Sequence, residues 1–247
     1  MKISKYLYWG MFILRQGGKM RIVLKISGHL LSPKPGHIDC KYISSLKDVL
    51  AQISEKTEKI VIVAGGGETA RHYIHVGRKL GFTELQKDRI GIEVSRIHAL
   101  ILAYFIDNSL KYIPSSIDDL ESHLPYAKII VTGGFEPGQS TTTVAALCAE
   151  AIKANLLLLA TTVDGVYTSD PKTDPNAKLL PRLHIEEAEK YIVQKISAGT
   201  YPLLDSFAIK LIKRSKIKTI VFNGNPPKNI LRILAGEHIG TEIVFSD

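Results

Sequence analysis

The sequence predicts an α/β fold, a three-layer αβα sandwich with a mostly parallel central sheet. Short apolar runs bounded by glycine or polar residues recur along the chain, and segments with apolar residues three or four positions apart lie between them. Uninterrupted apolar runs are typical of strands buried on both faces, and their alternation with amphipathic helices is typical of a parallel sheet. We therefore expect ligands to bind in loops at the carboxyl ends of the strands.

These runs also give the order of the elements. From Tyr201 onward the pattern predicts helix, strand, helix and strand, and we expect the last strand to close an edge of the sheet. The strands are predicted at residues 22–27, 59–64, 127–132, 156–161, 218–223 and 240–246. The apolar positions that predict two earlier helices are Ile43, Leu46, Leu50 and Ile53 in one, and Val94, Ile97, Ile101 and Tyr104 in the other.

Composition places the chain among ordinary globular proteins. Of its 247 residues, 45% are hydrophobic and 23% are charged, which excludes the disordered and fibrous classes. The two cysteines, Cys40 and Cys148, lie far apart without partners at metal-ligand spacing, so we expect neither a disulfide framework nor a zinc site, and a reducing cytoplasm fits. The net charge of +8 comes from 32 basic residues spread along the chain. That spread favours an anionic small molecule over nucleic acid as the partner.

The first nineteen residues stand apart from the rest. The apolar stretch YLYWGMFIL imitates a signal peptide, but no small-residue cleavage site follows it and it is too short to span a membrane. We expect residues 1–19 to be an uninformative extension upstream of a true start at Met20, and we expect no membrane partner. Residues 20–247 form the folded unit, with a boundary between two lobes near residue 160, where the polar loop DGVYTSDPKTDPN follows.

Three of the predicted strands run directly into glycine-rich loops, each of which could hold a phosphate group. In KISG (25–28), Lys25 lies within the strand just before a glycine that lets the backbone approach a ligand. Lys25 is the sharpest catalytic candidate, and the alternative is an edge-strand lysine with its ammonium group in water. In AGGGETARHY (64–73), three glycines precede a helix that carries Arg71. Its free N–H groups could bind an anion, or the glycines could serve only a tight turn.

The third loop, VTGGFEPGQSTTTVAA (131–146), leads into four consecutive hydroxyl residues, Ser140 to Thr143, that open a helix. One hydroxyl suffices for an N-cap, so four in a row after paired glycines favour an oxyanion or phosphate site about as much as capping alone.

A fourth segment, ATTVDGVYTSDP (160–171), could clasp a base and a ribose through the ring of Tyr167 and two acids, Asp164 and Asp170. Its aspartates could equally be turn residues before glycine and proline. Asp88 follows no evident pattern, and it could be the N-cap of the helix that carries Ile97.

The order KISG, GGG, Asp88 before GI, TGGFEPGQST and TTVDGVYTSDP resembles the amino acid kinase superfamily and, within it, the archaeal type of UMP kinase. The resemblance runs from Met20 to the C-terminus, and GTYPLLDSFAIKLIKRSKI (199–217) is among its most specific parts. It implies the αβα fold, a homohexamer, a place in cytoplasmic pyrimidine nucleotide synthesis, and transfer of the γ-phosphoryl group of ATP to UMP with Mg²⁺ as cofactor.

The resemblance also implies residue roles. Residues 20–160 would form the acceptor (UMP) lobe and residues 161–247 the ATP lobe, Lys25 and Arg71 would be catalytic, and no protein residue would bind the metal. The ATP contacts would be Lys25, Ile26, Ser27, Gly28, Gly67, Arg71, Thr161, Tyr167 and Asp170. The UMP contacts would be Gly66, Asp88, Gly134, Phe135, Glu136, Pro137, Gly138, Gln139, Ser140 and Thr141.

Two positions depart from the family pattern. His29 stands where relatives often carry a second lysine, which weakens the idea that two lysines embrace the triphosphate. Thr143 stands where bacterial UMP kinases have an aspartate that organises the catalytic lysines, so that function is absent here or has moved to another residue such as Asp205.

Phosphoryl transfer to a phosphate requires alignment and charge neutralisation rather than a general base, because the acceptor is already an anion. Three alternatives remain open from the sequence. The first is a kinase of the same fold that acts on a carboxylate, carbamate or isopentenyl phosphate. The second is a nucleotide-sensing or anion-storage protein without catalysis. The third is an RNA-binding regulator, which only the positive charge suggests.

Overall fold

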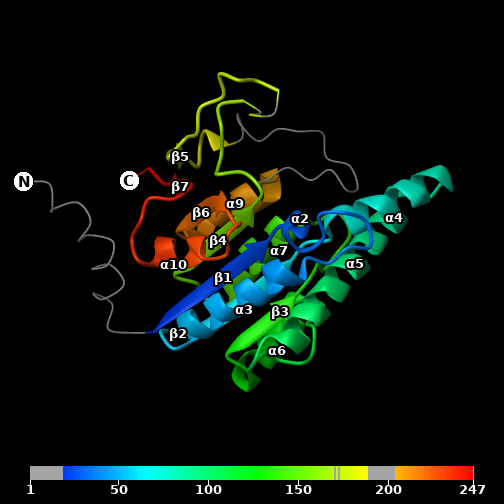
Figure 1. Ribbon diagram of the computed structural model, residues 1–247, viewed down its shortest axis with the longest axis horizontal. Helices are drawn as coiled ribbons and strands as arrows, with labels where there is room; N and C mark the ends of the chain where they lie inside the picture. Colours follow the sequence, from blue (N-terminus) through cyan, green and yellow to red (C-terminus); the bar gives the residue numbers. More distant parts are fainter. Residues whose placement is uncertain (1–18, 170, 172, 189–203, 247) are drawn as a thin grey trace, which may run out of the picture.

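The computed structural model describes residues 19–169, 171, 173–188 and 204–246 (Figure 1). Within them, seven strands form one sheet in the order β3-β2-β1-β4-β6-β7-β5. All neighbouring strands are parallel except β6 and β7, which are antiparallel. The predicted α/β class with a mostly parallel sheet is therefore confirmed. The strands are β1 (Met20–Ile26), β2 (Thr57–Ala64), β3 (Ile129–Thr132), β4 (Leu156–Thr161), β5 (Arg182–His184), β6 (Thr219–Asn223) and β7 (Thr241–Val244).

Helices cover both faces of this sheet (Figure 1). Alternate side chains of β1 enter two separate cores: Ile22 and Leu24 pack on the side of α3, and Val23 packs on the side of α7. In the described residues, no helix combines the length and apolar character that a membrane crossing requires. The helices are α2 (Gly28–Leu31), α3 (Cys40–Ser54), α4 (Gly67–Lys79), α5 (Glu84–Phe105), α6 (Ile117–His123), η1 (Leu124–Tyr126), α7 (Thr141–Ala151), α9 (Ser206–Ser215) and α10 (Asn229–Leu234).

All six predicted strands are present, and no end differs by more than two residues. The predicted place of the last strand is wrong. β7 lies between β6 and β5, so β5 closes that edge of the sheet. With only three residues, Arg182–His184, β5 is too short to produce a recognisable apolar run.

Two predictions about helix α5 are wrong: the residue that caps it and the face that it buries. It begins at Glu84 behind a capping box made by Thr83 and Gln86, so Asp88 lies inside the helix and is not its N-cap. Of the four apolar positions that predict this helix, only Val94 is buried; Ile97 is 56% and Tyr104 is 65% exposed. The buried face of the helix also contains polar and small residues, including Ser95, His98, Ala99 and Ala103.

Candidate functional site

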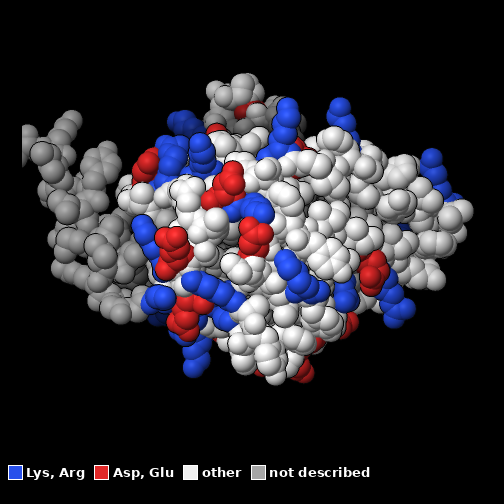
Figure 2. Space-filling view, turned by 60° about the horizontal axis from the view of Figure 1, so that its bottom comes forward, with Lys and Arg blue, Asp and Glu red and all other residues white. Residues whose placement is uncertain are grey.

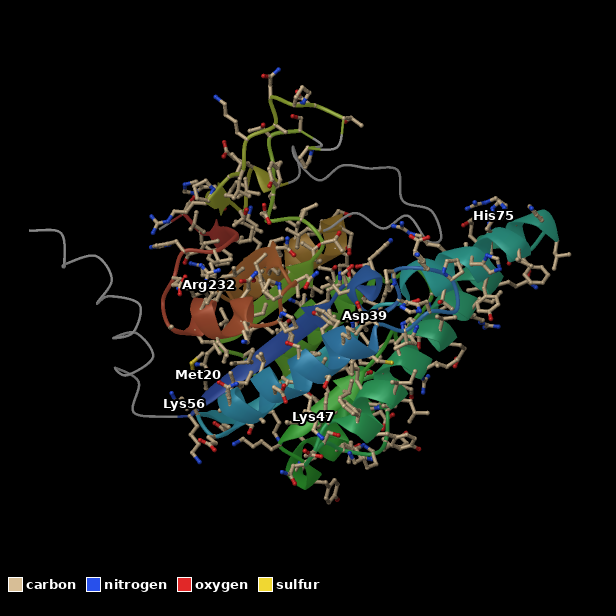
Figure 3. All side chains as sticks on the ribbon, in the orientation of Figure 1. Met20, Asp39, Lys47, Lys56, His75 and Arg232 are labelled. Carbon is tan, nitrogen blue, oxygen red and sulfur yellow. The ribbon has the colours of Figure 1, made fainter. Side chains whose placement is uncertain are left out.

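The three glycine-rich loops converge on one cavity at the carboxyl ends of β1, β2 and β3. In Figure 3, Asp39 at the start of α3 marks this end of the sheet, whereas Met20 and Lys56 lie at the opposite end. The sequence-predicted residues that line the cavity are Lys25, Ser27, Gly28, Gly66, Gly67, Arg71, Asp88, Gly134, Gln139, Ser140 and Thr141. Lys25 and the TGGFEPGQST segment thus face the same space.

Lys25 lies on a central strand, because β1 pairs with β2 on one side and β4 on the other. The alternative of an edge-strand lysine is therefore wrong. Its position alternates with those of Leu24 and Ile26, so its side chain leaves the sheet on the same face as Val23, the face that α7 covers. Burial lowers the pKa of Lys25 from 10.5 to about 8, and the negative charge of Asp205 opposes this effect. The charge of Asp205 therefore offsets only part of the cost of removing the Lys25 ammonium group from water.

The first two loops touch backbone to backbone. A Cβ atom on Gly28 would lie 1.9 Å from the Gly67 nitrogen, and one on Gly65 would lie 2.5 Å from the Gly28 nitrogen. Gly67 also has a φ of +61°, which favours glycine. Since α4 begins at Gly67, this close approach places N–H groups of a helix N-terminus beside Lys25 in the cavity. Glycine is thus required here by packing as well as by turn geometry.

The third loop ends at the N-terminus of α7, where the four hydroxyl residues have different tasks. Ser140 is the N-cap and accepts hydrogen bonds from the backbone N–H groups of Thr142 and Thr143, at 3.1 and 3.0 Å. Thr141 and Thr142 line the cavity. The Thr143 hydroxyl donates to the Asp205 carboxylate, at 2.8 Å from Oδ1. Capping therefore accounts for one hydroxyl and leaves two at the cavity wall.

Asp205 joins the N-termini of two helices. It is the N-cap of α9, accepting from the N–H groups of Phe207 and Ala208 at 3.0 and 2.9 Å, and it also accepts from the hydroxyls of Ser140 and Thr143. These bonds give the buried carboxylate its hydrogen-bond partners, and its negative charge raises the pKa of Lys25 against the effect of burial. Its placement makes Asp205 the candidate for the function that Thr143 cannot supply.

His29 lies at the cavity wall in a hydrogen-bonded cluster with Glu68 and Arg71. Its Nε2 atom is 2.6 Å from Glu68 Oε1, and the same oxygen is 3.1 Å from Arg71 Nη1. Burial and the charge of Arg71 lower the pKa of His29, against the opposing effect of Glu68. A neutral ring donating from Nε2 is thus favoured near neutral pH. His29 cannot replace a second lysine as a permanent cation.

Helix α5 forms the far wall. Asp88 Oδ2 accepts a hydrogen bond from the N–H of Gly138 at 2.8 Å, and the Ser95 hydroxyl accepts one from the N–H of Gly134 at 2.8 Å. Sequence reasoning found Asp88 but missed the rest of this wall. The helical spacing from Asp88 onward was the available signal, since residues three, four and seven positions later share its face. The missed lining residues on α4 and α5 are Ala70, Ile74, Gly91, Ile92 and Ser95.

Several predicted site residues do not line the cavity. Ile26 and Phe135 have side chains in the two cores. The tip of the third loop, Glu136 to Gly138, lies largely exposed. Thr161 is buried at the end of β4, and the Tyr167 hydroxyl donates to Asp164 at 3.2 Å, which in turn accepts from Asn223. Asp170 and part of the 199–217 motif lie outside the described residues.

Comparison with known proteins identifies the family of this chain. The sequence model of the amino acid kinase family matches residues 20–223. The chain belongs to the amino acid kinase family. Among its relatives in this family, the uridylate kinase of Sulfurisphaera tokodaii is 44% identical over 91% of this chain and 99% of its own length. That of Hyperthermus butylicus is 44% identical over 90% of this chain and 97% of its own length.

Solved structures of amino acid kinases agree. The crystal structure of uridylate kinase from Archaeoglobus fulgidus superimposes with a TM-score of 0.80 at 36% identity, covering 91% of this chain and all of that one. UMP kinase from Bacillus anthracis gives a TM-score of 0.75 at 26% identity, covering 91% of this chain and 95% of that one. The family resemblance inferred from the motifs is therefore confirmed.

Proposed function

We propose that this chain transfers the γ-phosphoryl group of ATP to UMP, giving UDP and ADP. The observation that carries the proposal is a partly buried lysine, Lys25, in one cavity with the N-termini of α4 and α7. Two helix N-termini facing one cation suit two phosphate groups that meet end to end. The names of the relatives supply the acceptor, since those from S. tokodaii, H. butylicus and A. fulgidus are all uridylate kinases.

The residues of the cavity act by position and charge. The transferred group spreads negative charge over its equatorial oxygens, and Lys25 and the N–H groups of the Gly65–Gly67 turn are placed to neutralise it. Arg71 adds a second cation on the early turns of α4. Asp88 and the Gly134–Thr141 loop would hold the acceptor, which needs no general base because its phosphate is already ionised. Thr161, Tyr167 and Asp170 would contact the ATP nucleoside.

Magnesium would enter with ATP. Among the described residues no three His, Cys, Asp or Glu side chains gather where they could hold a metal ion. Mg²⁺ does not require such a cluster, because that ion keeps several waters and takes substrate phosphates as ligands more readily than an all-protein cage. When bound, the ion would neutralise phosphate charge and orient the triphosphate. We accordingly propose Mg²⁺ as the cofactor, bound through ATP.

The proposal extends to assembly and location. We propose a homohexamer in the cytoplasm that serves pyrimidine nucleotide synthesis, with residues 20–160 as the acceptor lobe and 161–247 as the ATP lobe. An exposed apolar stripe on α5, Ile97, Ile101 and Tyr104, supports self-association. In Figure 2 the end of the molecule where α4 and α5 extend shows a broad area with few charged side chains, whereas basic and acidic groups are interspersed elsewhere on that face.

One experiment tests the reaction against its rivals. ATP consumption is measured in parallel with UMP, CMP, glutamate, aspartate and isopentenyl phosphate, with and without Mg²⁺. We expect a clear preference for UMP and dependence on the metal. Turnover of a carboxylic acid or isopentenyl phosphate in preference to UMP would replace the proposed acceptor. ATP binding without product over hours would instead indicate a sensor.

A further inference from the structure

Helix α5 presents a row of polar side chains to the loops of the cavity. Asp88, Ser95 and His98 are separated by seven and three residues, which places them on one face of the helix. Two of them are almost completely buried: Ser95 is 2% and His98 is 4% exposed. Buried polar side chains on a helix require partners, and here each of the three bonds to a backbone group of a glycine-rich loop.

His98 holds the first of these loops. Its Nδ1 atom lies 2.9 Å from the carbonyl oxygen of Gly65. A carbonyl can only accept, so the ring donates from Nδ1–H. Burial lowers the pKa of His98, which favours the neutral ring, and a neutral ring retains one N–H donor for this bond. His98 does not line the cavity, so it acts on any ligand through the loop.

The Gly65 carbonyl controls the direction of the next N–H group. Carbonyl and N–H of one peptide bond share a rigid plane, so fixing the Gly65 carbonyl also fixes the N–H of Gly66. The Gly65 N–H is bound in turn to the carbonyl of Ile26, at 3.0 Å, which ties the turn to β1 next to Lys25. Gly65, Gly66 and Gly67 all line the cavity. Three glycines would leave this turn with many conformations if it were not held.

Ser95 fixes the backbone of the loop after β3, as His98 fixes that of the loop after β2. Its hydroxyl accepts from the N–H of Gly134 at 2.8 Å and donates to the carbonyl of Ile92 at 2.7 Å. A Cβ atom on Gly133 would lie 2.7 Å from the Ser95 hydroxyl, so this loop packs directly on the helix. One rigid helix therefore holds loops that follow two different strands.

We propose that His98 and Ser95 are positioning residues, which align the two glycine-rich loops so that their N–H groups meet the phosphates of both nucleotides. This rests on the proposed function for the identity of the ligands. Misplacing a catalytic environment by about 1 Å can cost on the order of 100-fold in rate. The loss should appear in kcat/KM and in nucleotide affinity.

Two substitutions separate the hydrogen bond from the packing. Asn places its side-chain N–H₂ where His has Nδ1, whereas Leu has the shape of Asn without a donor. We expect H98L to lower the affinity for UMP and for ADP, measured by calorimetry, and to lower kcat/KM by about 10- to 100-fold. H98N should recover most of both losses. Ser95→Ala should weaken UMP binding more than ADP binding, because its loop lies on the proposed acceptor side.

The control is Ser109→Ala. Ser109 is also buried and its hydroxyl bonds to carbonyls near the end of α5, at 2.6 and 3.0 Å, but it does not line the cavity. It should change thermal stability without changing affinity or kcat/KM. If H98L merely lowered the melting temperature in the same way, or if H98N lost as much as H98L, the proposal would be overturned. Because calorimetry needs no turnover, failure of the wild type to phosphorylate UMP would count against the proposed function alone.

Discussion

Replacing Lys25 with Met should stabilise the folded protein while it lowers activity severely. Met has nearly the length and volume of the lysine stem and no charge, so it fills the same space between the sheet and α7. The lysine occupies a site that removes much of its hydration, and its pKa falls to about 8 in consequence. The folded state therefore bears a free-energy cost for the charge that catalysis uses.

The size of the cost follows from the pKa. The difference between 10.5 and about 8, at about 1.4 kcal/mol per pKa unit, is about 3 kcal/mol. Below pH 8 both the folded and the unfolded chain bind the proton, so the wild type bears the full cost. Between pH 8 and 10.5 the unfolded chain binds more protons, so the stability of the wild type rises with pH. The advantage of K25M should therefore be largest below pH 8 and should shrink as the pH rises towards 10.5.

Urea unfolding at pH 7 and pH 9.5, at one protein concentration, measures the difference in unfolding free energy. Steady-state kinetics should show a loss on the order of 100- to 1,000-fold, which is the range for removing one electrostatic stabiliser of a transition state. Lys210→Met, at an exposed position on α9, is the control and should change neither quantity by much. The reasoning is refuted if K25M is less stable than the wild type at pH 7, or if its advantage grows with pH.

Three further changes have defined outcomes. Asp205→Asn removes the charge that raises the pKa of Lys25, so the alkaline limb of the pH profile of kcat/KM should move to lower pH. An unchanged alkaline limb would show that Asp205 does not influence the titration of Lys25. Asp88→Ala loses a charged acceptor for the Gly138 N–H, so KM for UMP should rise about tenfold with little change in KM for ATP, and equal changes in both would contradict an acceptor role. Tyr104→Glu places a charge on the exposed stripe of α5 and should reduce the assembled mass in analytical ultracentrifugation; an unchanged mass would locate the interface elsewhere.

The sheet and the convergence of its loops were predictable because each strand carries its own local signal. Runs such as LLLLAT have no polar interruption, and such runs occur where both faces of a strand are covered. Parallel strands then bring their carboxyl ends to one edge, so KISG, GGG and TGGFEPGQST had to approach one another. Lys25 could be placed in this way without any knowledge of long-range contacts.

The wall formed by α5 was not predictable in the same way. The stripe of Ile97, Ile101 and Tyr104 has the spacing of a buried face, yet it is exposed, while the buried face carries Ser95 and His98. Apolar periodicity reports which face avoids water, and a face that serves a second copy of the chain gives the same signal as a core. The polar groups on the buried face are satisfied by glycine loops distant in sequence, and no local pattern encodes those partners.

Carboxylates interact with the basic side chains of the cavity before a ligand binds. Glu68 forms an ion pair with Arg71 and a hydrogen bond with the neutral His29, and the negative charge of Asp205 partly offsets the effect of burial on Lys25. These pairs keep the side chains ordered at a modest cost in affinity, because a phosphate that binds must compete with a carboxylate for the same donors. A phosphate carries more charge than Glu68 and also meets the N–H groups of two helix N-termini, so the exchange should favour the nucleotide. The carboxylate near Lys25 differs from Glu68, which pairs with Arg71. Four hydrogen-bond donors fix Asp205, so its carboxylate should stay in place when a nucleotide binds. Lys25 therefore lies on a central strand near a carboxylate that does not move, and we expect the nucleotides to align on it.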